Sequence, residues 1–91
     1  MANGNIKQST PFYLFTEDDL ITNIASVLDS QKFVCGRYTG NTSGKPSGYA
    51  GCFIGFKYVS DQMVVLVMTY AGEVYIRSKY GSWTAWTKLG G

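Results

Sequence analysis

The segment Gln62–Tyr70, QMVVLVMTY, limits the possible folds of this chain more than any other, because nearly every position in it is apolar. Side chains of a β-strand point alternately to the two faces of a sheet. One face of this strand would carry Met63, Val65, Val67 and Thr69, and the other Val64, Leu66, Met68 and Tyr70. An antiparallel sheet with one solvated face alternates apolar and polar residues instead. We therefore expect both faces of this strand to be covered.

A chain of this length has little material for that cover. Its 91 residues make one domain, and a domain of this size hides only somewhat more than ~60% of the surface of its unfolded chain. One helix can cover one face of the sheet. Either the sheet curls into a small closed sandwich, or other copies of the chain cover the second face. We favour self-association, for which closed cyclic symmetry is the usual solution.

One helix is predicted after Thr16. Thr16 is a suitable N-cap, and the acidic residues at 17–19 favour the positive end of the helix dipole. Apolar residues then recur at helical spacing, at Leu20, Ile21, Ile24, Ala25, Val27 and Leu28. The pattern indicates an amphipathic helix of about three turns that packs its apolar stripe on a sheet.

Strand-like segments surround this helix. Residues 11–15 could form an edge strand, and the helix is followed by apolar segments with a period of two at 33–38, 49–59, 62–70, 73–80 and 83–89. We predict an α+β, mainly β fold with one N-terminal amphipathic helix on an antiparallel β-meander of about four to five strands. The expected organisation is a flexible lead-in at 1–10 and a single domain at 11–91.

Composition excludes several kinds of site. The chain has no histidine, and its two cysteines, Cys35 and Cys52, do not match the spacing of zinc ligands, so we expect no metal and no cofactor. We favour two buried thiols over a Cys35–Cys52 disulfide. The net charge is +2 without a basic cluster, which argues against a nucleic-acid partner. The apolar run from Met63 to Met68 is too short to insert into a membrane.

The C-terminal third, VYIRSKYGSWTAWTKL, resembles the closing signature of pyocin-knob and related bacteriophage tail-fibre domains. The matching features are Arg77 in a strand, the Gly81-Ser82 turn, Trp83 and Trp86 spaced as Trp-x-x-Trp, and the terminal apolar Leu89. The resemblance covers roughly residues 20 to 90. It implies a viral protein of the virion tail fibre, made in the host cytoplasm, that acts as a homotrimer in host attachment.

The tryptophans and Arg77 are candidate ligand-binding residues. At a spacing of three in one strand, Trp83 and Trp86 should point to opposite faces. They could stack on sugars, or they could only pack and close the module. Arg77 could reach an acidic sugar or pair with Glu73, but stacking on a tryptophan is the role we favour.

The polar connection at 39–49 is the other candidate for recognition, because long loops in compact domains are often functional. It could equally be a mobile hairpin loop. The candidate glycan-binding residues in and beside it are Tyr38, Asn41, Thr42, Ser43, Lys45 and Tyr49. Catalysis is not expected, because without histidine the common hydrolytic schemes lack a base, and three of the six carboxylates are assigned to the start of the helix.

The leading functional expectation is therefore a receptor-binding knob domain that attaches a phage to bacterial surface polysaccharide, or another receptor, as a homotrimer. Two alternatives remain open. The domain could be a purely structural trimerisation and capping module of a fibre, or a stand-alone bacterial carbohydrate-binding domain.

Overall fold

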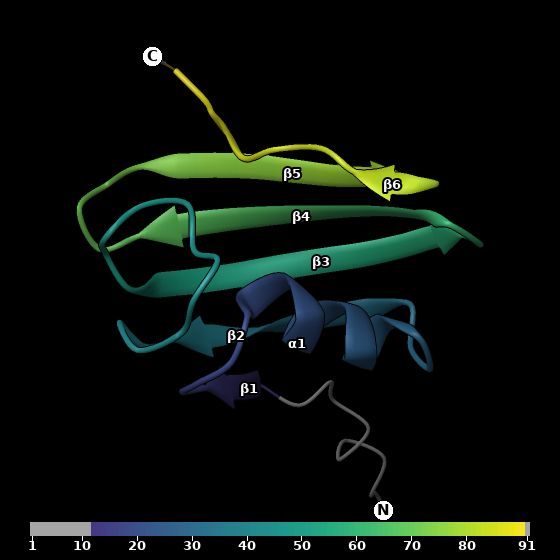
Figure 1. The fold of residues 1–91 in the computed structure, drawn as a ribbon, viewed down its shortest axis with the longest axis horizontal. Helices are drawn as coiled ribbons and strands as arrows, with labels where there is room; N and C mark the ends of the chain where they lie inside the picture. Colours follow the sequence, from purple (N-terminus) through teal and green to yellow (C-terminus); the bar gives the residue numbers. More distant parts are fainter. Residues whose placement is uncertain (1–11, 91) are drawn as a thin grey trace, which may run out of the picture.

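The computed structural model describes residues 12–90, which form one mixed β-sheet with a single helix packed on one side (Figure 1). The lead-in predicted at 1–10 lies outside the described residues. The spatial order is β1 (Phe12–Phe15), β2 (Phe33–Tyr38), β3 (Gly51–Val59), β4 (Gln62–Thr69), β5 (Val74–Tyr80) and β6 (Ser82–Trp83), while β7 (Thr87–Lys88) also pairs with β5.

The mainly β class with one helix on a meander is confirmed, because β2, β3, β4 and β5 are consecutive antiparallel neighbours. The prediction of a purely antiparallel sheet of four to five strands is wrong. The sheet has seven strands, and β1 runs parallel to β2 at its edge. Parallel neighbours need a crossover connection, and the helix α1 (Leu20–Leu28) provides it.

The helix begins later than predicted. Its N-cap is Asp19, whose Oδ2 accepts hydrogen bonds from the Thr22 backbone N–H at 3.0 Å and the Thr22 hydroxyl at 3.1 Å. The prediction of Thr16 as N-cap is wrong, because Asp18 has a left-handed backbone with φ of 66°. Ser43 also pairs with this segment, donating to Asp18 O and accepting from the Leu20 N–H. The helix therefore has nine residues, somewhat short of three turns.

Leu20, Ile24 and Leu28 are fully buried beneath the helix. The sheet contributes Val34, Phe53 and Val65 to the same core. A Cβ at Gly55 would lie 3.0 Å from Val34 Cγ1 and 3.5 Å from Ile24 Cγ2. The absence of a side chain at Gly55 therefore lets the helix pack closely on the centre of the sheet.

The two faces of the sheet are covered very differently. On the face that carries α1, here called the helix face, Met63, Val65, Val67 and Thr69 of β4 are buried. The opposite side, here called the open face, has no element of residues 12–90 packed across it (Figure 1). The sheet does not curl into a sandwich, because β1 and β6 lie at opposite ends of the strand order.

Strand register gives the open face three mostly apolar rows of side chains and, next to the row of Val64, a polar row of Gln62, Tyr80 and Ser82. The middle row is Phe12, Cys35, Ile54, Leu66, Ile76 and Thr87. The rows on either side of it are Phe33, Phe56, Val64 and Ser78, and Leu14, Arg37, Cys52, Met68 and Val74. Both cysteines are thiols, as expected, but they lie half-exposed on this face and are not buried. No helix in residues 12–90 has the length and apolar character that crossing a membrane requires.

We expect Asp19→Ala to lower the free energy of unfolding by about 1 kcal/mol, because it removes the side-chain acceptor at the helix N-terminus. Thr16→Ala should change stability by less than about 0.5 kcal/mol, because Thr16 is exposed and precedes the cap. Urea unfolding of both variants measures the difference. Equal losses would contradict the assignment of the cap.

Candidate binding groove

The C-terminal segment pairs with β5 through two short strands, β6 and β7. It has one more residue between these strands than the part of β5 that faces them. Trp83 pairs with Lys79 in β6, whereas Thr87 pairs with Ile76 in β7, a register displaced by one residue. Such a bulge moves the residues after it to the other side of a sheet. Trp86 therefore lies opposite Arg77 on the helix face, together with Trp83. The predictions of one continuous strand and of tryptophans on opposite faces are wrong for this reason.

Arg77 is held between the two tryptophans. Its guanidinium carbon lies 5.7 Å from the centroid of the Trp83 ring and 5.6 Å from that of the Trp86 ring. Its Nε donates a hydrogen bond of 2.6 Å to Thr84 O, in the bulged segment. These distances allow cation–π attraction to both rings. The favoured role of Arg77, stacking on a tryptophan, is confirmed, whereas the pairing of Glu73 is with Lys88 at 3.7 Å.

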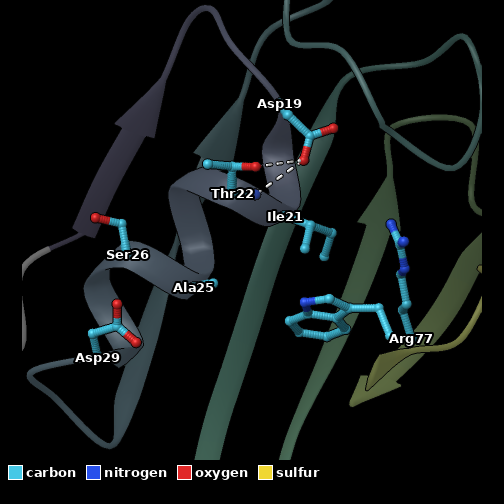
Figure 2. Close-up of a pocket in the computed structure, with 8 residues that line it drawn as sticks. Asp19, Ile21, Thr22, Ala25, Ser26, Asp29 and Arg77 are labelled. Carbon is cyan, nitrogen blue, oxygen red and sulfur yellow. Dashed lines mark hydrogen bonds between the residues drawn. The ribbon is translucent and has the colours of Figure 1, made fainter. Parts of the chain in front are cut away.

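Arg77, Trp83 and Trp86 are here called the aromatic corner. A groove of about 460 Å³ separates this corner from the outer side of α1 (Figure 2). Arg77 and Trp83 line one side of it. The helix lines the other with Asp19, Ile21, Thr22, Ala25, Ser26 and Asp29. Ile21 is buried, whereas Thr22, Ser26 and Asp29 are exposed and repeat at helical spacing. The groove therefore has an aromatic and cationic wall opposite a wall of hydroxyls and carboxylates.

The two carboxylates of the groove lie near opposite ends of the helix (Figure 2). Asp19 and Asp29 are ten residues apart, which corresponds to about 15 Å along a helix axis. Asp19 is half-buried and engaged as the N-cap, whereas Asp29 is exposed. The groove thus offers one carboxylate tied to the helix backbone and one that is open to solvent. Within residues 12–90 no group of three or more metal-ligand side chains occurs that could hold a metal ion.

The polar connection at 39–49 is fastened to the core through several of its predicted recognition residues. Tyr38 is buried, and its hydroxyl donates to Tyr49 O at 3.2 Å. Thr42 is also buried, and its hydroxyl donates to Phe15 O at 3.2 Å. Ser43 bonds the start of α1 through its backbone. Tyr38 and Thr42 therefore cannot reach a ligand from these positions, and we leave them out of the candidate site.

Gly44 joins this connection to the aromatic corner. Its carbonyl accepts a hydrogen bond of 2.8 Å from Trp86 Nε1. Gly44 has a φ of 72°, and a Cβ there would lie 2.1 Å from Asp19 Oδ1, so only glycine fits. The tip of the connection, the N-cap and Trp86 thus form one unit at the end of the groove. The indole N–H of Trp86 is used inside the protein.

The remaining candidates lie outside the groove lining. Asn41 is exposed and Lys45 is half-buried. Tyr49 packs edge-on against Tyr70 with ring centroids 5.2 Å apart. Of the nine predicted residues, only Arg77 and Trp83 line the groove. Trp86 does not line it, but its ring centroid lies 5.6 Å from the guanidinium carbon of Arg77. The helical wall was missed, although polar residues at 22, 26 and 29 of an amphipathic helix mark one surface that faces away from its core stripe.

Burial raises the pKa of Tyr38 to about 12, with smaller contributions from the neighbouring acidic groups Cys52, Glu73 and Tyr75. A phenol whose folded pKa exceeds its unfolded value near ~10 stabilises the fold below that pH. Its contribution to stability is lost as the pH rises from about 10 to about 12, because only the unfolded chain releases the proton in that range.

We expect Tyr38→Phe to be about 1 kcal/mol less stable than the native chain at pH 8, because it loses one hydrogen bond. The difference should shrink to roughly zero near pH 11, where the native chain alone loses about 1.4 kcal/mol through this phenol. Chemical unfolding across this pH range, monitored by circular dichroism, measures both values. A constant difference would show that the folded pKa is not raised.

The comparisons with known proteins leave the chain without an assigned family. No protein-family model, no curated protein and no solved structure matches it.

Proposed function

We propose that this chain is a non-catalytic knob module of a bacteriophage tail fibre, which attaches the virion to bacterial surface glycan as a homotrimer. The Trp-x-x-Trp signature supports the tail-fibre assignment by resemblance. The observation that carries the binding role is the groove of about 460 Å³ between the Arg77–Trp83 wall and the polar wall of α1. No cofactor or nucleic acid takes part in this function.

The chemistry of the groove fits a saccharide. Aromatic rings pack on the apolar C–H faces of sugars, and Trp83 is half-buried at the groove wall. Thr22, Ser26 and Asp29 supply exposed hydroxyl and carboxylate groups that can exchange hydrogen bonds with sugar hydroxyls. Ligand pockets commonly combine an apolar surface with a few polar groups that fix orientation.

The spacing of carboxylates favours binding over hydrolysis. Glycosidases use two carboxyl groups about 5 to 10 Å apart. Asp19 and Asp29 are separated by about 15 Å along the helix, and Asp19 already accepts two hydrogen bonds from Thr22. A shallow groove on each of three copies can still give firm attachment, because the second and third sites bind at a high effective concentration.

A second candidate function is a structural module that only trimerises and caps the fibre. Both tryptophans pack against the core cluster, and the Trp86 N–H is bonded to Gly44 O. These contacts favour a packing role for the motif. The same experiment separates the two functions, because a structural module binds no glycan through its groove.

The binding role predicts that filling the groove abolishes glycan recognition. Ser26 is exposed on the helical wall, so Ser26→Arg should occupy the groove without disturbing the core. An array of bacterial capsule and O-antigen polysaccharides, probed with the full chain, identifies the glycan, and calorimetric titration gives its affinity. We expect Ser26→Arg to weaken the affinity at least tenfold.

Ser30→Arg is the matched control. Ser30 is exposed just beyond the helix and does not line this groove, so its variant should bind like the native chain. Equal binding by both variants and the native chain would place recognition elsewhere. Absence of any bound glycan on the array would favour the structural module.

A further inference from the structure

We propose that the open face is the surface through which copies of this chain associate, with the β1–β2 side of one copy packed on the β4–β5 side of the next. The inference rests on the proposed homotrimer and identifies the surface that builds it. Every copy then contributes the same face around a closed axis that runs parallel to the strands.

The composition of the open face demands cover. Of the fifteen positions in its three apolar rows, only Arg37, Ser78 and Thr87 are polar or charged, and the polar row of Gln62, Tyr80 and Ser82 borders them. Phe12 is 66% exposed, Leu14 49%, Phe56 40% and Met68 38%. A single exposed apolar side chain is ordinary on a protein surface, but a contiguous apolar face is typical of an interaction site.

The apolar area of the face is large for a monomer. With roughly 200 Å² for a large side chain, those four residues alone expose about 390 Å². Eight further apolar residues of the face are partly exposed and add to this area. The largest apolar patch of a typical monomer is about 300–600 Å², whereas a stable interface covers about 800 Å² on each partner. Four residues of the open face therefore already expose as much apolar area as the largest patch of many monomers, before its partly exposed members are added.

The distribution of side-chain size identifies a second copy as the occupant. The three phenylalanines of the face, Phe12, Phe33 and Phe56, lie on β1, β2 and β3. The β4, β5 and β7 side carries no aromatic residue in these rows; its members are Val64, Leu66, Met68, Val74, Ile76, Ser78 and Thr87. Rotation about an axis parallel to the strands brings the β1–β3 side of one copy onto the β4–β5 side of the next. The aromatic side chains of one copy would then pack against the aliphatic side chains of the next.

A lipid surface fits the open face less well. Surfaces that bind membranes combine apolar residues and tryptophan with a rim of lysine and arginine. Both tryptophans lie on the helix face, and Arg37 is the one charged side chain in the three rows of the open face. Arg37 lies in an outer row, where it can keep contact with water at the rim of an interface.

The first test is the mass of the full chain in solution, measured by light scattering at micromolar concentrations. We expect the native chain to be a trimer, Phe56→Glu to be a folded monomer, and Gln31→Glu to remain a trimer. Gln31 is exposed between α1 and β2, and its Nε2 donates a hydrogen bond of 3.2 Å to the Tyr13 hydroxyl; a glutamate there would accept from that hydroxyl instead. A monomeric native chain, or a trimeric Phe56→Glu variant, would overturn the proposal.

Cys52 tests the surface independently of any variant that could fail to fold. Cys52 lies on the open face, so its thiol should react more slowly as the chain associates. In a Cys35→Ser background, the rate of reaction with a chromogenic disulfide reagent should fall at least tenfold between dilute and concentrated protein. A rate independent of concentration in an associated chain would assign association to another surface.

Cross-linking tests the arrangement of the copies. Leu14 and Val74 lie in the same outer row on opposite sides of the sheet. In a background lacking native cysteines, a short bismaleimide should join Leu14→Cys chains to Val74→Cys chains when the two are assembled together. Cross-links within either variant alone, or no cross-link in the mixture, would refute the side-to-side arrangement.

Two further measurements separate this inference from the proposed function and from a lipid partner. The Phe56→Glu monomer should keep the glycan affinity of each groove, because the groove lies on the helix face. A native chain that is a trimer but binds no glycan would contradict the proposed function and support the interface. Co-sedimentation with vesicles of phosphatidylcholine should recover none of the native chain. If the native chain is a monomer and sediments with the vesicles, the open face binds lipid and the inference is overturned.

Discussion

The crossover from β1 to β2 governs the rest of this structure. A parallel pair of strands cannot be joined by a tight turn. The single helix of residues 12–90 forms the connection between β1 and β2, and it lies on one side of the sheet. Its apolar stripe, with Leu20, Ile24 and Leu28, then fills the space above Gly55. Residues 12–90 have no other helix to cover the reverse side. The division into a helix face and an open face follows from this one connection.

The apolar pattern of 62–70 did not predict this division, because it is apolar on both faces; the single predicted helix indicated that the chain could cover one face. Burial alternates along β4 because one face packs under the helix and the other does not, although both are apolar in sequence. The meander from β2 to β5 was predictable because its turns and periods are local. The parallel β1 was missed because pairing direction depends on where a connection leads, even though a strand, a helix and a strand in succession favour a parallel pair.

The candidate groove shows where sequence reasoning is weakest. Arg77 and Trp83 could be selected because rare, large side chains stand out in a sequence. The opposite wall consists of ordinary polar helix residues, such as Thr22 and Ser26, which resemble any solvated helix until the fold places them across from an aromatic ring. Tyr38 and Thr42 were selected by residue type, but their neighbours bury them. The helix start at Asp19 depends on the distant Ser43 and Gly44, which local capping rules do not include.

The register of β7 on β5 is displaced by one residue from that of β6. If residues 84–88 kept the register of β6 instead, Trp86 would lie opposite Ile76 on the open face. Loss of one residue between Trp83 and Trp86 would remove the bulge and still leave Trp86 opposite Arg77, because the residues that follow would keep their partners on β5. The face on which the second indole lies is therefore set by the register of β7, and a one-residue change in the length of the connection can be absorbed without moving that indole.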